Sequence, residues 1–228
     1  TISIFGARRK ENGLTAAIPF ARIAAQYQNV PPLNEALQTR DKANAFLVSG
    51  MNMQIRDDDA DAPALVLANE IIGGGFLHSR LATRIRQKEG ISYGVGSRLA
   101  LGAEDRVARF TTYAIYAPQN LARLEAAMRE ELTRAVSDGF TDDEINQARS
   151  GLMQRFVLNR AQDGSLAGAL VRLMQLERTP LWDAEIERKL LALTAAEVNA
   201  ALKRHVDPAR FSVIKAGDFP EAAAKSGG

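Results

Sequence analysis

The sequence contains no cysteine and only two histidines, and these shortages restrict its chemistry more than any other feature. Without cysteine the chain can form neither disulfide bonds nor thiolate metal sites. The histidines, His78 and His205, are single residues in different expected helices, and neither belongs to an H-x-x-E-H motif or its inverse. The helix motif of zinc proteases needs two histidines one turn apart with a glutamate beside them. We therefore expect no metal site in this chain.

Long apolar runs and an excess of one charge are also missing. No segment approaches the roughly 18 consecutive apolar residues of a membrane-spanning helix. The 29 basic and 27 acidic residues nearly cancel, and no basic stripe is interleaved with aromatics, so we expect no nucleic-acid partner. Residues 1–6 are followed at once by basic residues and do not resemble a signal peptide. The compartment is left open, with the periplasm favoured over the cytoplasm, since many exported bacterial proteins also lack cysteine.

The length of 228 residues, with 46% hydrophobic residues, suffices for one domain with a sizeable core. We expect a single domain over residues 1–228. Within it, residues 1–42 form a first strand (1–6) and an irregular connector broken by Pro19, Pro31 and Pro32. Residues 43–218 form the core, and residues 219–228 a tail.

The spacing of apolar residues predicts an α+β fold. Strands are expected over 43–55, 91–101, 107–117 and 211–216. Helices are expected over 61–73, 79–89, 121–136, 141–162, 166–178, 182–193 and 194–207. Capping boxes at Thr141 and Thr194 predict the start of two of them. Because strands come in pairs and helices in runs, we expect two layers, with the helices packed on one face of a mixed, largely antiparallel sheet.

Two patterns are compatible with ligand binding, but each has a simpler interpretation. Residues 73–75 are three glycines that could cradle a phosphate, yet they follow a helix and no Lys-Ser/Thr pair comes after them. A helix stop is therefore favoured. Asp57, Asp59 and Asp61 have the spacing of a calcium loop, but the turn-forming glycine and the bidentate glutamate of such a loop are absent. A solvated loop before a helix is favoured there, and a structural role is favoured for both histidines.

Arg86 and Tyr93 form a more promising pair. Arg86 lies near the end of the helix that closes at Gly90, and Tyr93 lies just inside the next strand. A helix end, a glycine turn and a strand start can bring two such side chains to one side of a corner. There the guanidinium fork and the hydroxyl could hold a peptide carbonyl and stabilise an oxyanion. The alternative is that Arg86 pairs on a helix surface and Tyr93 packs in a sheet.

Residues 67–97 resemble a signature of pitrilysin/insulinase-family zinc metallopeptidases, in the C-terminal half that carries no zinc. The segment reads LANEIIGGGFLHSRLATRIRQKEGISYGVGS. It shows the family pattern of a helix, a glycine-rich stop, Ser-Arg-Leu, and then Ile-Arg-x-x-x-Gly, an apolar residue, one further residue and Tyr. Looser similarity extends over residues 40–218, while residues 1–40 match only as a strand and a connector.

The resemblance implies the LuxS/processing-peptidase-like metallohydrolase fold, as in mitochondrial processing peptidases. In that family two homologous halves face each other around a chamber. One half carries the zinc and its inverted motif, and the other supplies an Arg and a Tyr that contact substrate near the metal. These two residues correspond to Arg86 and Tyr93, so the resemblance implies that they bind substrate and that no catalytic residue lies in this chain. Zinc is expected only in the partner half.

The resulting hypothesis is the substrate-binding half of a zinc-dependent metalloendopeptidase, inactive alone. Its expected partners are a zinc-bearing homologous domain or subunit and a peptide substrate. The isolated chain could also form a homodimer through the surface that its partner would cover. The alternatives are a non-catalytic scaffold or a peptide-binding subunit with the same fold. Retention of both Arg86 and Tyr93 argues against the scaffold.

Overall fold

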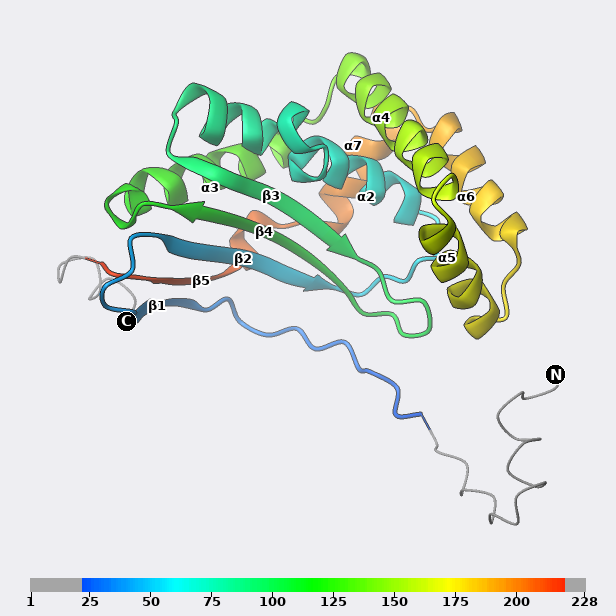
Figure 1. The fold of residues 1–228 in the computed structure, drawn as a ribbon, viewed down its shortest axis with the longest axis horizontal. Helices are drawn as coiled ribbons and strands as arrows, with labels where there is room; N and C mark the ends of the chain where they lie inside the picture. The colour runs from blue at the N-terminus through cyan, green and yellow to red at the C-terminus, as the bar shows by residue number, and fades with distance from the viewer. Residues whose placement is uncertain (1–21, 220–228) are drawn as a thin grey trace, which may run out of the picture.

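The computed structural model describes residues 22–219 (Figure 1). The strand expected over residues 1–6 lies outside these residues, as does all but the first residue of the expected tail at 219–228. Within the described part, no helix is both long and apolar enough to cross a membrane.

A five-stranded sheet forms one layer of the molecule. Its strands are β1 (Asn34–Gln38), β2 (Ala45–Met53), β3 (Ser92–Ala100), β4 (Ala108–Tyr116) and β5 (Ser212–Gly217). They lie in the order β1-β5-β2-β4-β3, and every neighbouring pair is antiparallel except the parallel pair of β1 and β5. Figure 1 shows them side by side in this order. The expected mixed, largely antiparallel sheet is confirmed.

Strand β1 corrects the expectation that the connector up to residue 42 has no regular structure. Its sequence Asn-Glu-Ala-Leu-Gln has no apolar alternation, and four of its five residues are exposed. The strand exists because its backbone pairs with β5, about 180 residues further along the chain. A local pattern does not report such a long-range pairing.

The helices follow the expected order, with differences at their ends. They are α2 (Ala62–Asn69), the π-helix η1 (Glu70–Gly74), the π-helix η3 (Ala82–Lys88), α3 (Leu121–Ser137), α4 (Asp142–Arg160), α5 (Asp163–Gln175), α6 (Pro180–Ala192) and α7 (Ala195–His205). Both capping boxes are present, at Thr141 and Thr194. The break expected at residues 163–165 lies at 161–162 instead, and Asp163 begins α5.

The two faces of the sheet have different surroundings. Along β2 and β4, every second residue is buried against the helix layer, as Leu47 and Phe110 illustrate. Figure 1 shows the helices gathered along one side of the sheet. The alternate residues point to the other side, which we call the open face. The cross-strand register places on it the following residues: Glu35, Leu37, Phe46, Val48, Gly50, Asn52, Gly94, Gly96, Arg98, Ala100, Arg109, Thr111, Tyr113, Ile115, Ser212, Ile214 and Ala216.

Candidate functional site

The corner between η3 and β3 carries both residues that the sequence singles out. Gly90 turns the chain with φ +64°, a left-handed conformation that favours glycine. The backbone N–H of Ile91 donates to the carbonyl of Ile85 at 3.1 Å, which closes the helix end. Arg86 lies in the last turn before this corner and is partly buried, and Tyr93 lies immediately after it. The two residues therefore lie on the two arms of one turn.

Tyr93 is the extra residue of a β-bulge. Ser92 pairs with Tyr116 of β4 and Gly94 pairs with Ile115, so Tyr93 has no partner of its own in the register. A bulge places two residues opposite one and redirects the side chain of the extra residue. The side chain of Tyr93 is 89% exposed, and its hydroxyl has no hydrogen-bond partner among residues 22–219. Tyr93 therefore contributes little to packing within this chain.

Most other residues of the same segment have structural roles. The hydroxyl of Ser79 accepts from the backbone N–H of Ala82 at 3.3 Å and caps the turn. Arg80 donates to both carboxylate oxygens of Glu144, at 2.6 and 2.9 Å. Leu81 and Ile85 are fully buried. In contrast to these residues, Tyr93 is directed at solvent.

The three glycines act as a helix end that fits against the sheet and against a carboxylate. A Cβ on Gly73 would lie 2.3 Å from the backbone nitrogen of Ser97 in β3, so only glycine fits. A Cβ on Gly74 or Gly75 would lie 3.2 or 3.4 Å from the carboxylate of Glu70. A carboxylate at this position repels an anion, so the geometry favours the helix stop over a phosphate loop.

The acidic run after β2 is divided among separate ion pairs. Asp57, Asp59 and Asp61 each contact a different basic partner, namely Arg178 at 2.7 Å, Arg106 at 2.8 Å, and Arg204 at 2.6 Å with His205 at 2.8 Å. The hydrogen bond from Arg204 and the one from His205 hold the pKa of Asp61 below its ordinary value. Carboxylates committed to arginines in this way favour a structural role over a calcium loop.

The residues present do not fit a zinc ion. His205 is hydrogen-bonded to Asp61, and His78 is exposed beside the glycine segment. Within residues 22–219, no group of three or more His, Cys, Asp or Glu side chains could hold a metal ion. We therefore assign no chemical step in this chain to a bound metal.

Three buried charges among the described residues, Glu70, Glu131 and Lys215, were not anticipated from the sequence. Glu70, in η1, is buried and ion-paired with Arg155 of α4. Lys215, in β5, is 2% exposed, and its amino group lies 2.6 Å from Glu125 of α3. A lysine in a short strand and a glutamate in a helix look like surface residues in a sequence. Only their paired positions in the fold show that they connect helices to other elements.

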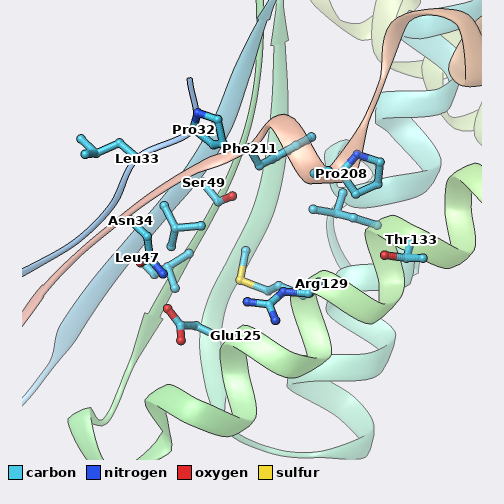
Figure 2. Close-up of a pocket in the computed structure, with 14 residues that line it drawn as sticks. Pro32, Leu33, Asn34, Leu47, Ser49, Glu125, Arg129, Thr133, Pro208 and Phe211 are labelled. Carbon is cyan, nitrogen blue, oxygen red and sulfur yellow. The ribbon is translucent and has the colours of Figure 1, made fainter. Parts of the chain in front are cut away.

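Glu125, the partner of Lys215, also lines a pocket on the helix-covered face of the sheet. The pocket has a volume of about 470 Å³. Figure 2 shows Leu47, Ser49, Glu125 and Arg129 among its lining residues, between α3 and the strands. Tyr116 is electrostatically coupled to Glu125. Its buried hydroxyl has no hydrogen-bond partner among residues 22–219, and burial, together with the charge of Glu125, raises its pKa. Neither Arg86 nor Tyr93 is among the residues that line this pocket, so it is separate from their corner.

Much of the chain is similar in sequence to known proteins. Residues 7–152 match the family model described as the peptidase M16 inactive domain. An uncharacterised zinc protease of Streptomyces coelicolor is 32% identical over 127 residues, which make up 56% of this chain and 27% of that protein. A second zinc protease, from Mycobacterium tuberculosis, is 29% identical over 68% of this chain and 34% of its own length. The chain thus spans about a third or less of these relatives.

Solved structures share the fold. The peptidase M16 inactive domain from Pseudomonas fluorescens matches with a TM-score of 0.79 at 20% identity, over 94% of this chain and 50% of that chain. The periplasmic protease PqqL from Escherichia coli matches with a TM-score of 0.65 at 18% identity, over 92% of this chain and 22% of that chain. At such identities the likeness establishes the architecture only.

Proposed function

This chain belongs to the M16 peptidase family, in its inactive domain, and on that premise we propose that it is the substrate-binding half of a zinc-dependent metalloendopeptidase. Membership of this zinc-protease family and the fold expected from the sequence are confirmed. The more specific role rests on the corner between η3 and β3. The zinc of the endopeptidase would be held by another domain or subunit.

The observation that carries the proposal is the position of Tyr93. An aromatic side chain that is 89% exposed on a bulge contributes little to the stability of its own domain. Bulges are common next to active sites, because they aim a side chain out of the ladder. Tyr93 lies in the part of the chain that matches the family model. A hydroxyl presented in this way is suited to donate a hydrogen bond to a partner outside the chain.

Arg86 and Tyr93 would act as substrate-binding residues. The hydroxyl of Tyr93 would donate to the carbonyl oxygen of the scissile peptide and to the oxyanion that develops there. The guanidinium of Arg86 would hold the peptide backbone on the other arm of the corner. Neither role requires a metal ligand from this chain.

The test is peptide cleavage by this chain combined with the domain or subunit that carries the zinc motif. We expect Tyr93→Phe to lower kcat by about 10²-fold, the typical cost of removing one oxyanion donor. Arg86→Ala should raise KM and lower kcat. A matched control is Lys88→Ala, in the same π-helix as Arg86. This control should keep the wild-type rate.

Folding and assembly must be unchanged for the comparison to count, so each variant is checked by circular dichroism and size-exclusion chromatography with its partner. Wild-type rates in both Tyr93→Phe and Arg86→Ala would contradict the site assignment. No cleavage with a zinc-loaded partner would favour the scaffold or the peptide-binding subunit.

Two further parts of the proposal concern assembly and location. Without its partner, the isolated chain would associate with a second copy through the surface that the partner would cover. A monomer by light scattering at high concentration would contradict this association.

We also propose a periplasmic location, which is the location named for the similar protease PqqL. Fractionation of the source cells would test it.

A further inference from the structure

The open face has an apolar end and a basic end. At the end of the open face that lies near the start of β3, the face carries Ile115 of β4, Phe46 of β2 and Leu37 of β1. At the opposite end, near the end of β3, the open face carries Arg98 of β3 together with Thr111 and Arg109 of β4. Thr111 pairs directly with Arg98 in the register, and Arg109 lies two residues before it on the same face. The two guanidinium groups therefore project from diagonal neighbours on adjacent strands.

These two arginines differ from most others in the described part of the chain. Arg80, Arg178 and Arg204, for example, each bind a carboxylate through two nitrogens. Arg98 and Arg109 are exposed, and within residues 22–219 neither side chain has a hydrogen bond or an ion pair. Two like charges side by side repel each other. An anion bound between them would relieve this repulsion.

The nearby acidic groups do not neutralise this end. Asp105, at the β3–β4 turn, binds Arg22 at 2.7 Å, and Asp59 binds Arg106 at 2.8 Å. On the open face itself, the acidic residue that the register places is Glu35 of β1. Three strand spacings separate β1 from β4, about 14 Å, which exceeds the Debye length of about 8 Å at physiological ionic strength. Among the residues that the structure describes, the basic end is therefore electrostatically uncompensated.

The same end is also hollowed. A groove of about 310 Å³ on the open face is lined by Arg109, Thr111, Gly50 and Asn52. Gly50 keeps its floor low, because a Cβ there would lie 2.7 Å from the carbonyl oxygen of Phe110. A side chain of the size of Asp or Glu fits such a volume, and it would meet the guanidinium of Arg109 there.

We infer that the open face binds peptides with an acidic side chain at a fixed distance from the residue held at Tyr93. Tyr93 and Arg98 are five residues apart on β3, about 16 Å along an extended strand. An extended peptide covers this length with four or five residues. The substrate class is thus a peptide with Asp or Glu four or five residues from the scissile bond. This specificity rests on the proposed function, since it uses Tyr93 as its reference point.

The test measures the binding of fluorescein-labelled extended peptides to this chain alone by fluorescence anisotropy. One peptide carries two glutamates toward one end, and a matched peptide carries glutamines there. We expect the acidic peptide to bind about tenfold more tightly, and Arg98→Gln/Arg109→Gln to abolish the difference. The control Arg129→Gln/Arg172→Gln has the same change in net charge, on α3 and α5, and should preserve the preference. Added salt should weaken binding of the acidic peptide more than binding of the glutamine peptide.

Equal binding of the two peptides, no binding of either, or an equal loss in the control pair would overturn the inference. Cleavage with the zinc-bearing partner separates it from the proposed function. If Arg98→Gln/Arg109→Gln removes the acidic preference while Tyr93→Phe leaves cleavage unchanged, the acidic site stands and the role of Tyr93 fails. If Tyr93→Phe lowers kcat while both peptides bind alike, the proposed function stands and the acidic preference fails.

Discussion

Replacing Arg80 by alanine should destabilise the fold, although the Arg80 side chain is partly exposed. The side chain of Arg80 is 20% exposed and that of Glu144 is 29% exposed. Besides its two bonds to Glu144, Arg80 donates to the carbonyl of Gly139 at 2.7 Å. Its guanidinium also lies 4.8 Å from the centre of the Phe140 ring. One side chain thus ties the chain before η3 to the start of α4.

The expected loss follows from these contacts. The ion pair contributes about 1 kcal/mol, discounted for its exposure. The hydrogen bond to the Gly139 carbonyl contributes about 1 kcal/mol, and the contact with the Phe140 ring about 0.5–1 kcal/mol. Arg80→Ala should therefore lower the free energy of unfolding by about 2–3 kcal/mol. Arg80→Lys should cost about half as much, because lysine keeps the charge but loses the planar fork.

The assay is urea unfolding of wild type, Arg80→Ala, Glu144→Gln and the double variant, which isolates the coupling of the two residues. Burial alone would raise the pKa of Glu144, but hydrogen bonds from Arg80 and Thr141 outweigh it, and the folded-state pKa lies below its ordinary value. The carboxylate therefore stabilises the fold above the unfolded-state pKa, and this contribution is lost as the pH falls through the folded-state pKa.

The coupling energy should thus be present at neutral pH and decline in acid. A loss below about 1 kcal/mol for Arg80→Ala would refute the reasoning, because it would be no larger than that of an ordinary surface arginine. A coupling energy that stays constant as the pH falls would show that the ion pair is not its source.

Two glycine substitutions should have opposite effects on stability. Gly73→Ala should lower the free energy of unfolding by about 2–4 kcal/mol, because the new Cβ would meet the backbone of Ser97 and Gly96 and push η1 away from β3. Gly168→Ala, in α5, should raise it by up to about 1 kcal/mol, since a Cβ there meets nothing within 4 Å and alanine favours a helix. Urea unfolding of both variants under identical conditions checks the pair, and a destabilised Gly168→Ala would show that α5 is not helical at this position.

The signals that predicted helices and turns correctly are local ones. Thr141 and Glu144 lie three residues apart, and their side chains bind each other's backbone N–H groups as the capping box requires. Gly90 adopts the positive φ that its place after a helix suggests. These interactions form within about one turn of chain, so neighbouring residues are sufficient to specify them.

The candidate site was only partly predictable. Arg86 and Tyr93 follow from the resemblance of their segment to a family signature, and both remain hypotheses until cleavage is measured. The bulge that exposes Tyr93 did not follow from the sequence, because a bulge is a mismatch between two strands and β4 decides it. The pairing of Lys215 with Glu125 was likewise invisible, since the partners are 90 residues apart.

By itself, the sequence determined the main helices, the strands β2 to β5, the fold class and the family, because periodicity, caps and a continuous motif lie within short stretches of chain. The tertiary structure decided the sheet order, the parallel strand β1 and the register of β3 against β4. That register brings Arg98 and Arg109 together without an acidic partner in the part of the chain that the structure describes. Strand register depends on which distant segments share a buried face, and a shift by one residue would exchange the two faces of a strand.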